Sequence, residues 1–561
     1  MGGHDGGTAQ PYRLATGGRI DRGRTLRFTF DGRTLTGHPG DTVASALLAN
    51  GVRVVGRSVD LGRPRGVYTC GVEEPNALLR IDAEPMVAAT TVPLRDGLAA
   101  ASLRGKGRLT EPDGAAGRHD KAYLHCDVLV VGGGPAGLAA ALAAGVTGAR
   151  VVLVDEQEEV GGDLLGSRVR IDGAPAAEWV AAVLGRLAAL PETRVLPRTT
   201  ALGYYDHNYL VALERRGPDA TRLWHIRAVR VVLATGAHER LIPFPGNDRP
   251  GVMLANAART YANRYGVLPG RRAVVFTCAD SGYLAAADLL AAGVDVAAIV
   301  DPRPGDGPAA AAVAGRGVEV LRGAAVTGTG AGDQGVLASV TVRAGGHERV
   351  FEADLLAVCG GWNPAVHLFG QSQGRLRFDD DLQAYVPHLS AQAERSAGAC
   401  RGVYGTAAAI ADGFSAGAQA AELCGYARPG RWAAPPTDEP DGPAEPTAPL
   451  RDLVEHEPAP GAHREAFVDL HRDVTVAGIR RALGAGLRSA EHVKRYTTAG
   501  TGAEQGKTAV TSPVVSALLG DPAGPTTFRP PYTPVSFAAL AGKDRGMLSD
   551  PARLTALHDR H

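Results

Sequence analysis

The stretch Val128-Leu129-Val130-Val131-Gly132-Gly133-Gly134-Pro135-Ala136-Gly137 decides the fold. A run of four apolar residues is typical of a buried parallel strand, and the glycines after it predict a tight turn into a helix. Gly132 permits the turn, Gly134 lets backbone amides approach a pyrophosphate, and Gly137 lets the helix pack close to the strand. The helix begins at Pro135 and Ala136, so that its positive end would face the phosphates. The stretch therefore predicts a dinucleotide site.

A carboxylate follows the second predicted strand at the distance that such a site needs. Residues 151–154 are apolar, and Asp155-Glu156-Gln157 comes next, with Asp155 eighteen residues beyond Gly137. A carboxylate at this place accepts hydrogen bonds from an adenosine ribose. Because Asp155 favours a ribose with free hydroxyls over a 2′-phosphate, we expect NAD or FAD rather than NADP.

Two further segments are candidates for the same site. In Gly161-Gly162-Asp163-Leu164 a glycine pair lets the chain skirt a cofactor, and a plain glycine turn is the alternative. The strand at residues 231–233 runs into Ala234-Thr235-Gly236, where small side chains allow backbone contact with a nucleotide. The candidate cofactor-binding residues therefore include Gly162, Asp163, Leu164, Thr235 and Gly236.

The chain as a whole predicts an α/β fold with tandem Rossmann-like units, of the FAD/NAD-binding, disulfide-reductase-like kind. Apolar strand-like runs alternate with alanine-rich helical stretches, which indicates parallel sheets with crossover helices. The runs are residues 151–154, 229–233, 273–276, 296–300 and 355–358. We assign residues 122–240 and 355–425 to the dinucleotide-binding unit and residues 241–354 to a second Rossmann-like unit inserted into it.

Four other segments surround these units. Residues 1–22 are glycine-rich and polar, and we expect a flexible tail. Residues 23–105 predict a β-grasp ferredoxin-like module, with a hairpin turn at Asp31-Gly32 and a helix capped by Asp41 or Thr42. Residues 426–462 form a Pro-rich linker. Residues 463–561 form a small, mostly helical C-terminal interface segment, with helix expected over residues 466–495.

The second unit lacks an intact glycine turn. In Thr277-Cys278-Ala279-Asp280-Ser281-Gly282, threonine and alanine replace the first two glycines, and Asp280 would repel a phosphate. We therefore expect a structural unit, which counts against a free-standing NADH-driven enzyme. Near the end of the first unit, Gly405-Thr406 has threonine where FAD proteins of this build place aspartate. Gly405 and Thr406 remain cofactor-site candidates, and this change favours NAD over FAD.

Composition argues against several other functions. Lys+Arg and Asp+Glu both number 59, so bulk charge indicates neither a nucleic-acid nor a membrane partner. Six scattered cysteines form no close pair, and no secretory signal is seen at the N-terminus, so we expect reduced thiols in the cytoplasm. The sequence shows no metal-ligand cluster and no catalytic triad. We expect His238 and His492 to be structural rather than general bases.

Ordered strings along the chain resemble one family, the α subunit of heterotetrameric sarcosine oxidase and related multi-subunit flavin-dependent amine dehydrogenases. The strings include Phe28-Thr29-Phe30-Asp31-Gly32, Glu73-Glu74-Pro75-Asn76-Ala77, Pro243-Phe244-Pro245-Gly246-Asn247, Gln505-Gly506-Lys507-Thr508 and Phe528-Arg529-Pro530-Pro531-Tyr532. The resemblance implies NAD on the first unit, amine oxidation on a β subunit that carries FAD, and FMN between the α and β subunits. It also implies a small zinc-binding subunit.

Two departures from the family pattern set further expectations. Some relatives carry a [2Fe-2S] module with four clustered cysteines, whereas residues 23–105 contain only Cys70, so we expect no iron–sulfur cluster. The chain also stops at His561, where the family's folate-binding, aminomethyltransferase-like domain would begin. We therefore expect a separate folate-binding chain, or a reaction that releases no formaldehyde, and the amine stays open.

A group of cations and hydroxyls near the C-terminus fits the implied FMN. Its members are Lys494, Thr497, Thr498, Lys507 and Thr508. Charge-assisted hydrogen bonds from such groups can hold a phosphate, and a solvated basic helix end is the alternative. We expect none of the candidate residues to act directly on substrate.

These observations predict an oxidoreductase subunit that needs partner subunits. It would be the dinucleotide-binding α subunit of a flavin-dependent oxidase or dehydrogenase for a secondary amine or amino acid. One alternative is a stand-alone FAD enzyme that uses NADH. The other is a non-catalytic scaffold with a structural dinucleotide.

Overall fold

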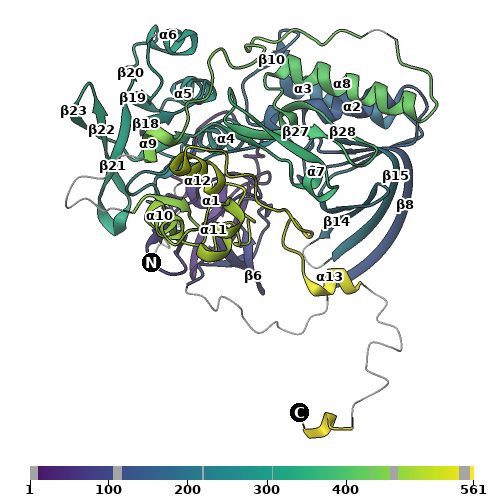
Figure 1. Ribbon diagram of the computed structural model, residues 1–561, viewed down its shortest axis with the longest axis horizontal. Coiled ribbons are helices and arrows are strands. Elements are labelled where there is room, and N and C mark those ends of the chain that lie inside the picture. Colours follow the sequence, from purple (N-terminus) through teal and green to yellow (C-terminus); the bar gives the residue numbers. More distant parts are fainter. Residues whose placement is uncertain are drawn as a thin grey trace, which may run out of the picture.

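The computed structural model describes residues 10–104, 117–217, 220–305, 307–430, 432–454, 465–542 and 556–560. The predicted α/β class is confirmed, because two sheets that contain parallel strands and carry helices form the centre of the molecule. In Figure 1 the first unit lies on the right, the second on the left, and the N-terminal module and C-terminal helices lie below them.

The N-terminal module is a five-stranded sheet with one helix. β1 (Leu26–Phe30) and β2 (Arg33–Gly37) form a hairpin through Asp31 and Gly32, whose φ angles of 48° and 79° suit a two-residue turn. Thr42 caps α1 (Val43–Ala49) by accepting a hydrogen bond from the Ser45 amide. The strands of the sheet lie in the order β2-β1-β7-β5-β6, with β5 (Leu78–Ile81), β6 (Glu84–Ala88) and β7 (Leu98–Ala101). The strands β3 (Gly56–Arg57) and β4 (Pro64–Arg65) form a separate pair.

The expected flexible tail is wrong for residues 10–22. The Arg13 guanidinium donates to the Asp41 carboxylate at 2.7 Å and to the Tyr265 carbonyl at 2.7 Å. The side chains of Arg13 and Asp41 are only 8% and 0% exposed. Because a buried carboxylate needs a cationic partner, this segment is fixed to the module and to the second unit.

The first unit carries the glycine turn between β8 (Arg118–Val131) and α2 (Pro135–Gly145). Its sheet has the order β12-β9-β8-β15-β14-β13, and β28 pairs with β15. Helix α8 (Thr406–Leu423) packs directly on α2, because Gly413 and Gly417 lie against the backbone of Ala136 and Ala140. The other elements are β9 (Val151–Val154), η1 (Gly162–Leu165), β10 (Arg170–Ile171), β11 (Ala174–Pro175), α3 (Ala176–Ala188), β12 (Thr193–Leu196), β13 (Thr199–Tyr205), β14 (Tyr209–Gly217), β15 (Ala220–Leu233), β28 (Glu394–Ser396) and η3 (Gly398–Arg401).

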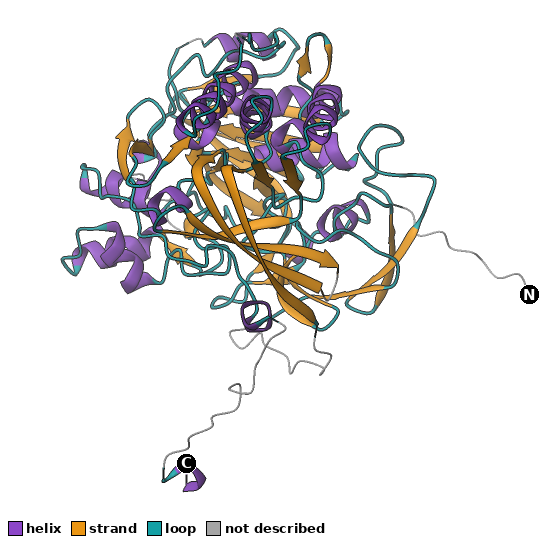
Figure 2. Cartoon of the chain, turned by 90° about the vertical axis from the view of Figure 1, so that its right-hand side faces the viewer, coloured by secondary structure: helices purple, strands orange, loops and turns teal. Residues whose placement is uncertain are grey.

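Strands β8 and β15 are longer than the sequence predicted. Each has 14 residues, whereas the apolar runs begin only at Val128 and Val229. The outer halves continue the same parallel pairing back to Arg118 and Ala220. Figure 2 shows these long strands running out from the helical part of the molecule.

The second unit has a parallel sheet of order β17-β24-β18-β19-β20. The apolar runs at residues 273–276, 296–300 and 355–358 form β18, β19 and β24 at its centre. The assignment of residues 355–359 to the dinucleotide-binding unit is therefore wrong, because β24 pairs in parallel with β17 and β18. Its elements are β17 (Val252–Leu254), α4 (Ala255–Tyr265), β18 (Arg272–Thr277), α5 (Ser281–Ala291), β19 (Asp295–Asp301), α6 (Pro308–Ala314), β20 (Val320–Arg322), β21 (Ala325–Ala331), η2 (Asp333–Gly335), β22 (Leu337–Ala344), β23 (His347–Glu352) and β24 (Leu355–Cys359).

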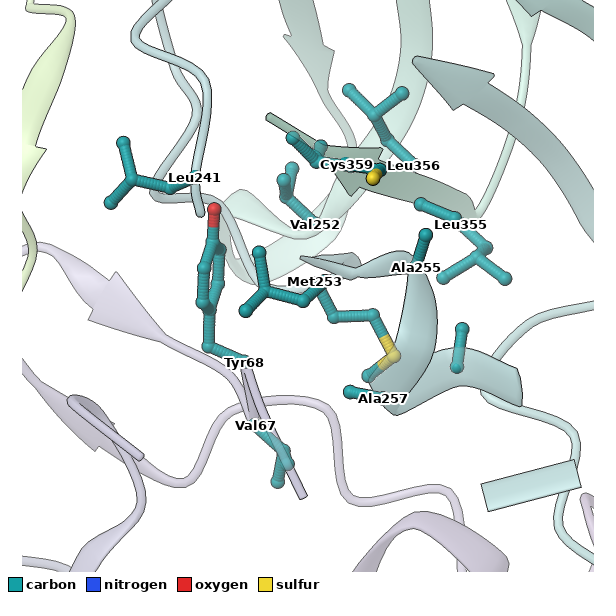
Figure 3. Close-up of a cluster of buried hydrophobic side chains, with 14 of the residues drawn as sticks. Val67, Tyr68, Leu241, Val252, Met253, Ala255, Ala257, Leu355, Leu356 and Cys359 are labelled. Atoms are coloured by element: carbon teal, nitrogen blue, oxygen red, sulfur yellow. The ribbon is translucent and has the colours of Figure 1, made fainter. Parts of the chain in front are cut away.

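One hydrophobic core joins the N-terminal module, the second unit and the C-terminal segment. Figure 3 shows the contact between the first two: Tyr68, at 1% exposure, lies beside Leu241, Val252 and Met253. The module is therefore a fixed part of the molecule that frames one side of the candidate site.

The C-terminal segment begins with a hairpin and not with helix. Residues 466–495, expected to be mostly helical, start with β29 (Phe467–Asp469) and β30 (Val474–Thr475), because Phe467 and Val468 are buried and extend the core. The helices that follow are α10 (Val476–Gly484), α11 (Ala490–Thr497), α12 (Thr511–Leu519), α13 (Phe537–Ala541) and η4 (His558–Arg560).

Residues 432–454, from the predicted Pro-rich linker, lie against both units. The Arg170 amide donates to Asp438 at 2.7 Å, and the Ala444 amide donates to Asp280 at 2.7 Å. We call residues 437–447 the strap. The remaining elements are β16 (Ala237–Glu239), β25 (Trp362–Pro364), α7 (His367–Gln371), β26 (Arg375–Asp379), β27 (Ala384–Leu389) and α9 (Arg451–Val454). None of the helices described combines the length and apolar character that crossing a membrane requires.

Candidate nucleotide-binding site

The glycine turn after β8 is shaped by close backbone contacts. Gly132 has a φ of +100°, and a Cβ there would lie 2.2 Å from the Ala234 carbonyl oxygen. A Cβ on Gly137 would lie 1.8 Å from the Gly132 carbonyl oxygen. These two glycines are therefore required by the packing of the protein itself.

Gly134 is glycine for a different reason. It is the N-cap residue of α2, and its φ of −73° suits any residue. A Cβ there would meet only the Gly162 Cα, at 4.0 Å, within the described chain. The space beside Gly134 opens onto a cavity at the positive end of α2. This is the arrangement in which helix-terminal amides bind a pyrophosphate.

Asp155 fixes the glycine turn. One carboxylate oxygen accepts a hydrogen bond from the Gly133 amide at 2.6 Å, and the other accepts from the Gln157 amide at 2.8 Å. The side chain is buried, and this burial raises its pKa against the effect of the two amides. Asp155 thus ties the end of β9 to the turn, a task that its position in the sequence did not indicate.

Glu156 is the carboxylate that stays available. It lines the same cavity, and within the described chain its carboxylate forms no hydrogen bond. Burial and the charge of Asp155 together raise the pKa of Glu156 to about 7, although the charge of Arg215 opposes them. We therefore propose that Glu156 would accept hydrogen bonds from the ribose hydroxyls, whereas Asp155 holds the loop.

We expect Glu156→Gln and Asp155→Asn to differ. Glu156→Gln should weaken NAD binding about tenfold, because hydrogen bonds to a charged group contribute about 1.5–3 kcal/mol, while the melting temperature without ligand stays unchanged. Asp155→Asn should weaken binding and also destabilise the protein by about 1–3 kcal/mol, because asparagine keeps only one acceptor oxygen for the amides of Gly133 and Gln157. Titration calorimetry and thermal unfolding separate the two effects.

The pH dependence of NAD binding gives a control on this assignment. With a pKa of about 7, the ionised fraction of Glu156 rises from about one tenth at pH 6 to about nine tenths at pH 8. Since the carboxylate is the better acceptor, wild-type affinity should rise with pH across this range, and Glu156→Gln should abolish the rise. An unchanged pH profile in this variant would assign the ribose contact elsewhere.

The other first-unit candidates border the same space. η1 begins at Gly162, whose φ is +58° and whose Cβ would lie 2.9 Å from the Gly134 Cα. Asp163 accepts from Asn256 at 3.1 Å, and Leu164 is buried. The Thr235 hydroxyl donates to the Ala365 carbonyl at 2.8 Å, next to Gly236 with its φ of +73°.

These residues line a single cavity of about 840 Å³. It lies between the two units, and a volume of this size is within the range of cofactor sites. The cavity is lined by the sequence-predicted residues Gly132, Gly134, Pro135, Ala136, Asp155, Glu156, Gln157, Gly162, Asp163, Leu164, Thr235, Gly236, Gly405 and Thr406. Gly137 lies behind the turn, and its role is the close packing described above.

The corresponding turn of the second unit is filled by its own side chains. The Thr277 hydroxyl donates to the Ala279 carbonyl at 2.6 Å and accepts from the Ala279 amide at 3.1 Å. A Cβ on Gly282 would lie 2.3 Å from the Thr277 hydroxyl oxygen. Asp280 pairs with Arg303 at 2.7 Å. This turn therefore lacks the open glycine that the first turn has at Gly134.

The C-terminal candidates separate into two places. Lys507 is 2% exposed, and its ammonium donates to the carbonyls of Glu504 at 2.9 Å and Tyr532 at 3.2 Å. It lines a second cavity of about 300 Å³ together with Gly506 and Ser512. Thr508 is buried beside it. Lys494, Thr497 and Thr498 lie at the end of α11, outside the lining of this cavity.

Two histidines separate the cavities. His238 and His367 line both of them. His238 lies 3.2 Å from the Tyr532 hydroxyl, and the ring of His367 is 3.8 Å from that of Tyr532. Burial, with the charge of Lys507 nearby, lowers the pKa of His238 to about 3 and that of His367 in the same direction. Both rings are therefore neutral at pH 7, whereas His492 is exposed.

Three segments match known protein families. Residues 126–409, about half of the chain, match the description pyridine nucleotide-disulphide oxidoreductase. The chain belongs to the pyridine nucleotide-disulphide oxidoreductase family. Outside this segment, residues 463–543 match the sarcosine oxidase A3 domain, and residues 23–105 match the 2Fe-2S iron-sulfur cluster binding domain.

The predicted resemblance to sarcosine oxidase α subunits is confirmed. The chain is 48% identical to sarcosine oxidase subunit alpha of Corynebacterium sp. (strain P-1), over 98% of this chain and 60% of that protein. It is 40% identical to the same subunit of Rhizobium meliloti (strain 1021), over 98% and 61%. The chain thus spans about three fifths of the length of these relatives.

One solved structure shares the fold of almost the whole chain. The L-proline dehydrogenase from P. horikoshii superposes with a TM-score of 0.74 at 23% identity, and the match covers 95% of this chain and 100% of that one. At this level of identity the likeness concerns the fold alone. It supports a common arrangement of the N-terminal module, the two units and the C-terminal segment.

The expectation of a chain without an iron–sulfur cluster is contradicted, because residues 23–105 match a 2Fe-2S cluster-binding domain. Residues 23–105 do not provide the usual ligands for such a cluster, which is bound by four cysteines. Cys70 is the one cysteine of the segment, and the described residues contain no group of three or more metal-ligating side chains. The proposed function therefore includes no step through a cluster.

Proposed function

We propose that the chain is the dinucleotide-binding α subunit of a multi-subunit, flavin-dependent oxidase or dehydrogenase that acts on a secondary amine or an amino acid. The observation that carries the proposal is the glycine turn open at Gly134, in a chain that is 40% to 48% identical to α subunits of sarcosine oxidase. Amine oxidation would occur on a β subunit that carries FAD, because the main cavity here is built around groups that bind a nucleotide.

The residues of this chain would bind and orient NAD or FAD, which when bound supplies hydride or electron transfer. The amides at the start of α2 would hold the pyrophosphate, Glu156 the adenosine ribose, and the backbone at Thr235 and Gly236 the central part of the nucleotide. Asp155 would keep the turn in this shape.

FMN would bind where this chain meets the β subunit, at the smaller cavity lined by Lys507. Lys507 now donates to two carbonyls, so it would have to exchange these partners for a phosphate. A small zinc-binding subunit and a separate folate-binding chain are further proposed partners. All six cysteines are free thiols, which supports a cytoplasmic location.

The identity and location of the cofactors test this proposal. The chain is purified alone and together with a co-expressed β subunit, each sample is denatured, and the released cofactors are identified by absorbance and mass. We expect a dinucleotide from the single chain and FMN only from the complex. Lys507→Ala should lower the FMN content of the complex and leave the dinucleotide in place.

Two results would contradict the proposal. If the single chain oxidised NADH with bound FAD at one per protein, it would be a self-sufficient reductase. If the complex oxidised secondary amines equally well after Gly134→Ala had removed the dinucleotide, this chain would serve only as a scaffold. Full FMN occupancy in Lys507→Ala would remove Lys507 from the flavin site.

A further inference from the structure

We propose that Glu439 of the strap supplies the carboxylate that α8 lacks, and that it binds the hydroxyls of the second sugar of the dinucleotide. This inference rests on the proposed nucleotide site and adds a binding residue from outside both Rossmann-like units. The second sugar is ribose in NAD and ribitol in FAD, and its hydroxyls are the shared chemistry.

Glu439 reaches the cavity at the start of α8. One of its carboxylate oxygens accepts a hydrogen bond from the Thr406 hydroxyl at 2.8 Å. The other accepts from the Arg259 guanidinium at 3.3 Å. Glu439, Thr406 and Arg259 all line the 840 Å³ cavity that also contains the glycine turn. Its side chain is 17% exposed, so acceptor capacity remains toward the cavity.

The strap is held on both sides of Glu439. Before it, the Arg170 amide donates to the Asp438 carboxylate at 2.7 Å. After it, Asp280 accepts from the amides of Ala444 at 2.7 Å and Glu445 at 3.2 Å. The Glu445 carboxylate in turn pairs with Arg322 at 2.7 Å. The strap therefore connects the two units and fixes the position of Glu439 between them.

Gly405 shows how closely the strap covers α8. A Cβ on Gly405 would lie 2.6 Å from the Asp441 carbonyl carbon, and the φ of Gly405 is +90°. The start of α8 thus has the strap backbone on one side and the cavity on the other. A carboxylate beside a helix N-terminus is also favoured by the helix dipole. Thr406, where FAD proteins of this build place aspartate, hydrogen-bonds instead to a carboxylate that comes from the strap.

This arrangement removes one argument for NAD over FAD. The sequence favoured NAD because Thr406 provides no carboxylate, yet Glu439 brings one to the same end of the same helix. The position is therefore acidic in the folded protein, and either dinucleotide would find an acceptor for its second sugar.

Glu439 can be replaced by a neutral residue without leaving the buried Arg259 guanidinium unpaired. Arg259 is 8% exposed, but it also donates to Asp288 at 2.6 Å. Glu439→Gln keeps the side-chain length and an oxygen that can accept from Thr406. The matched control is Asp441→Asn, which removes one charge from an exposed strap residue that is not a cavity-lining residue.

The experiment compares dinucleotides with ADP, which lacks the second sugar. The full chain, stripped of bound nucleotide, is titrated with ADP, NAD and FAD in a calorimeter. We expect Glu439→Gln to lower the affinity for the dinucleotide that the wild type binds by about tenfold. ADP affinity should stay within about twofold, and Asp441→Asn should match the wild type with every ligand.

A second variant tests whether the carboxylate or the strap matters. Thr406→Asp combined with Glu439→Gln returns a carboxylate to the helix, and it should recover most of the lost dinucleotide affinity. Equal losses for ADP and dinucleotide in Glu439→Gln, or no loss at all, would overturn the role of Glu439. A wild-type chain that binds none of the three ligands would overturn the nucleotide site itself.

Discussion

Gly134→Ala is expected to lower the affinity for NAD by at least about 100-fold while the protein stays folded. The added methyl group would meet no protein atom closer than the Gly162 Cα at 4.0 Å, and the φ of −73° suits alanine. The methyl group would instead occupy the space in which a pyrophosphate approaches the α2 amides. A 100-fold loss corresponds to about 2.7 kcal/mol, which is readily measured by titration calorimetry.

Gly137→Ala is the matched control at the same turn. Its Cβ would lie 1.8 Å from the Gly132 carbonyl oxygen, so α2 would have to move away from β8. We expect a loss of about 1–3 kcal/mol or more in the free energy of unfolding, measured by chemical denaturation. Wild-type NAD affinity in a folded Gly134→Ala protein would show that the pyrophosphate does not bind at this turn.

The sequence was sufficient for the parts of the fold whose signals are local. The apolar run at residues 128–131 and the Asp31-Gly32 hairpin each depend on neighbouring residues, and each was predicted. The helix cap was predicted at Asp41 or Thr42, and Thr42 forms it. The outer half of β8 was not predicted, because it begins with four polar residues, 118–121, and is stabilised by pairing with the start of β15. That pairing is a long-range contact with no local signature.

In the candidate site, too, the residues with a local sequence signal were predicted and those that depend on long-range contacts were not. The glycine turn and its acidic neighbours were predicted because their spacing is fixed by one βαβ unit. The different roles of Asp155 and Glu156 were not predicted, because they depend on which carboxylate accepts the hydrogen bond from the Gly133 amide. No sequence motif indicated Glu439 as a site residue, because it lies in a Pro-rich segment, 33 residues from its partner Thr406 along the chain.

Arg65→Met is expected to cost about 3–5 kcal/mol of stability, the largest effect on folding among these variants. Arg65 donates to Asp248 of the second unit and, at 2.5 Å, to Asp473 of the C-terminal segment. The side chains of all three residues are 2% exposed or less. Methionine fills a similar space and leaves both carboxylates without this cation.

The size of this loss depends on what remains for the two carboxylates. Asp248 keeps Arg63 at 2.6 Å, and Asp473 keeps the amides of Asp60 and Leu61 at 2.9 Å each. Each carboxylate therefore keeps at least one hydrogen-bond donor, so we expect a folded protein with a lower denaturation midpoint. The control is Arg95→Met, because the Arg95–Asp82 pair is about 40% exposed and such pairs contribute about 0–1 kcal/mol.

The same variant shows whether this junction keeps the segments together. Arg65 links the N-terminal module, the second unit and the C-terminal segment within one hydrophobic core, so its loss should let the C-terminal segment open before the second unit unfolds. Compared with the wild type, hydrogen exchange in Arg65→Met should then accelerate more in α10 and α11 than in β18 and β24. Uniformly faster exchange across the chain would mean that the core, and not the Arg65 junction, couples these segments.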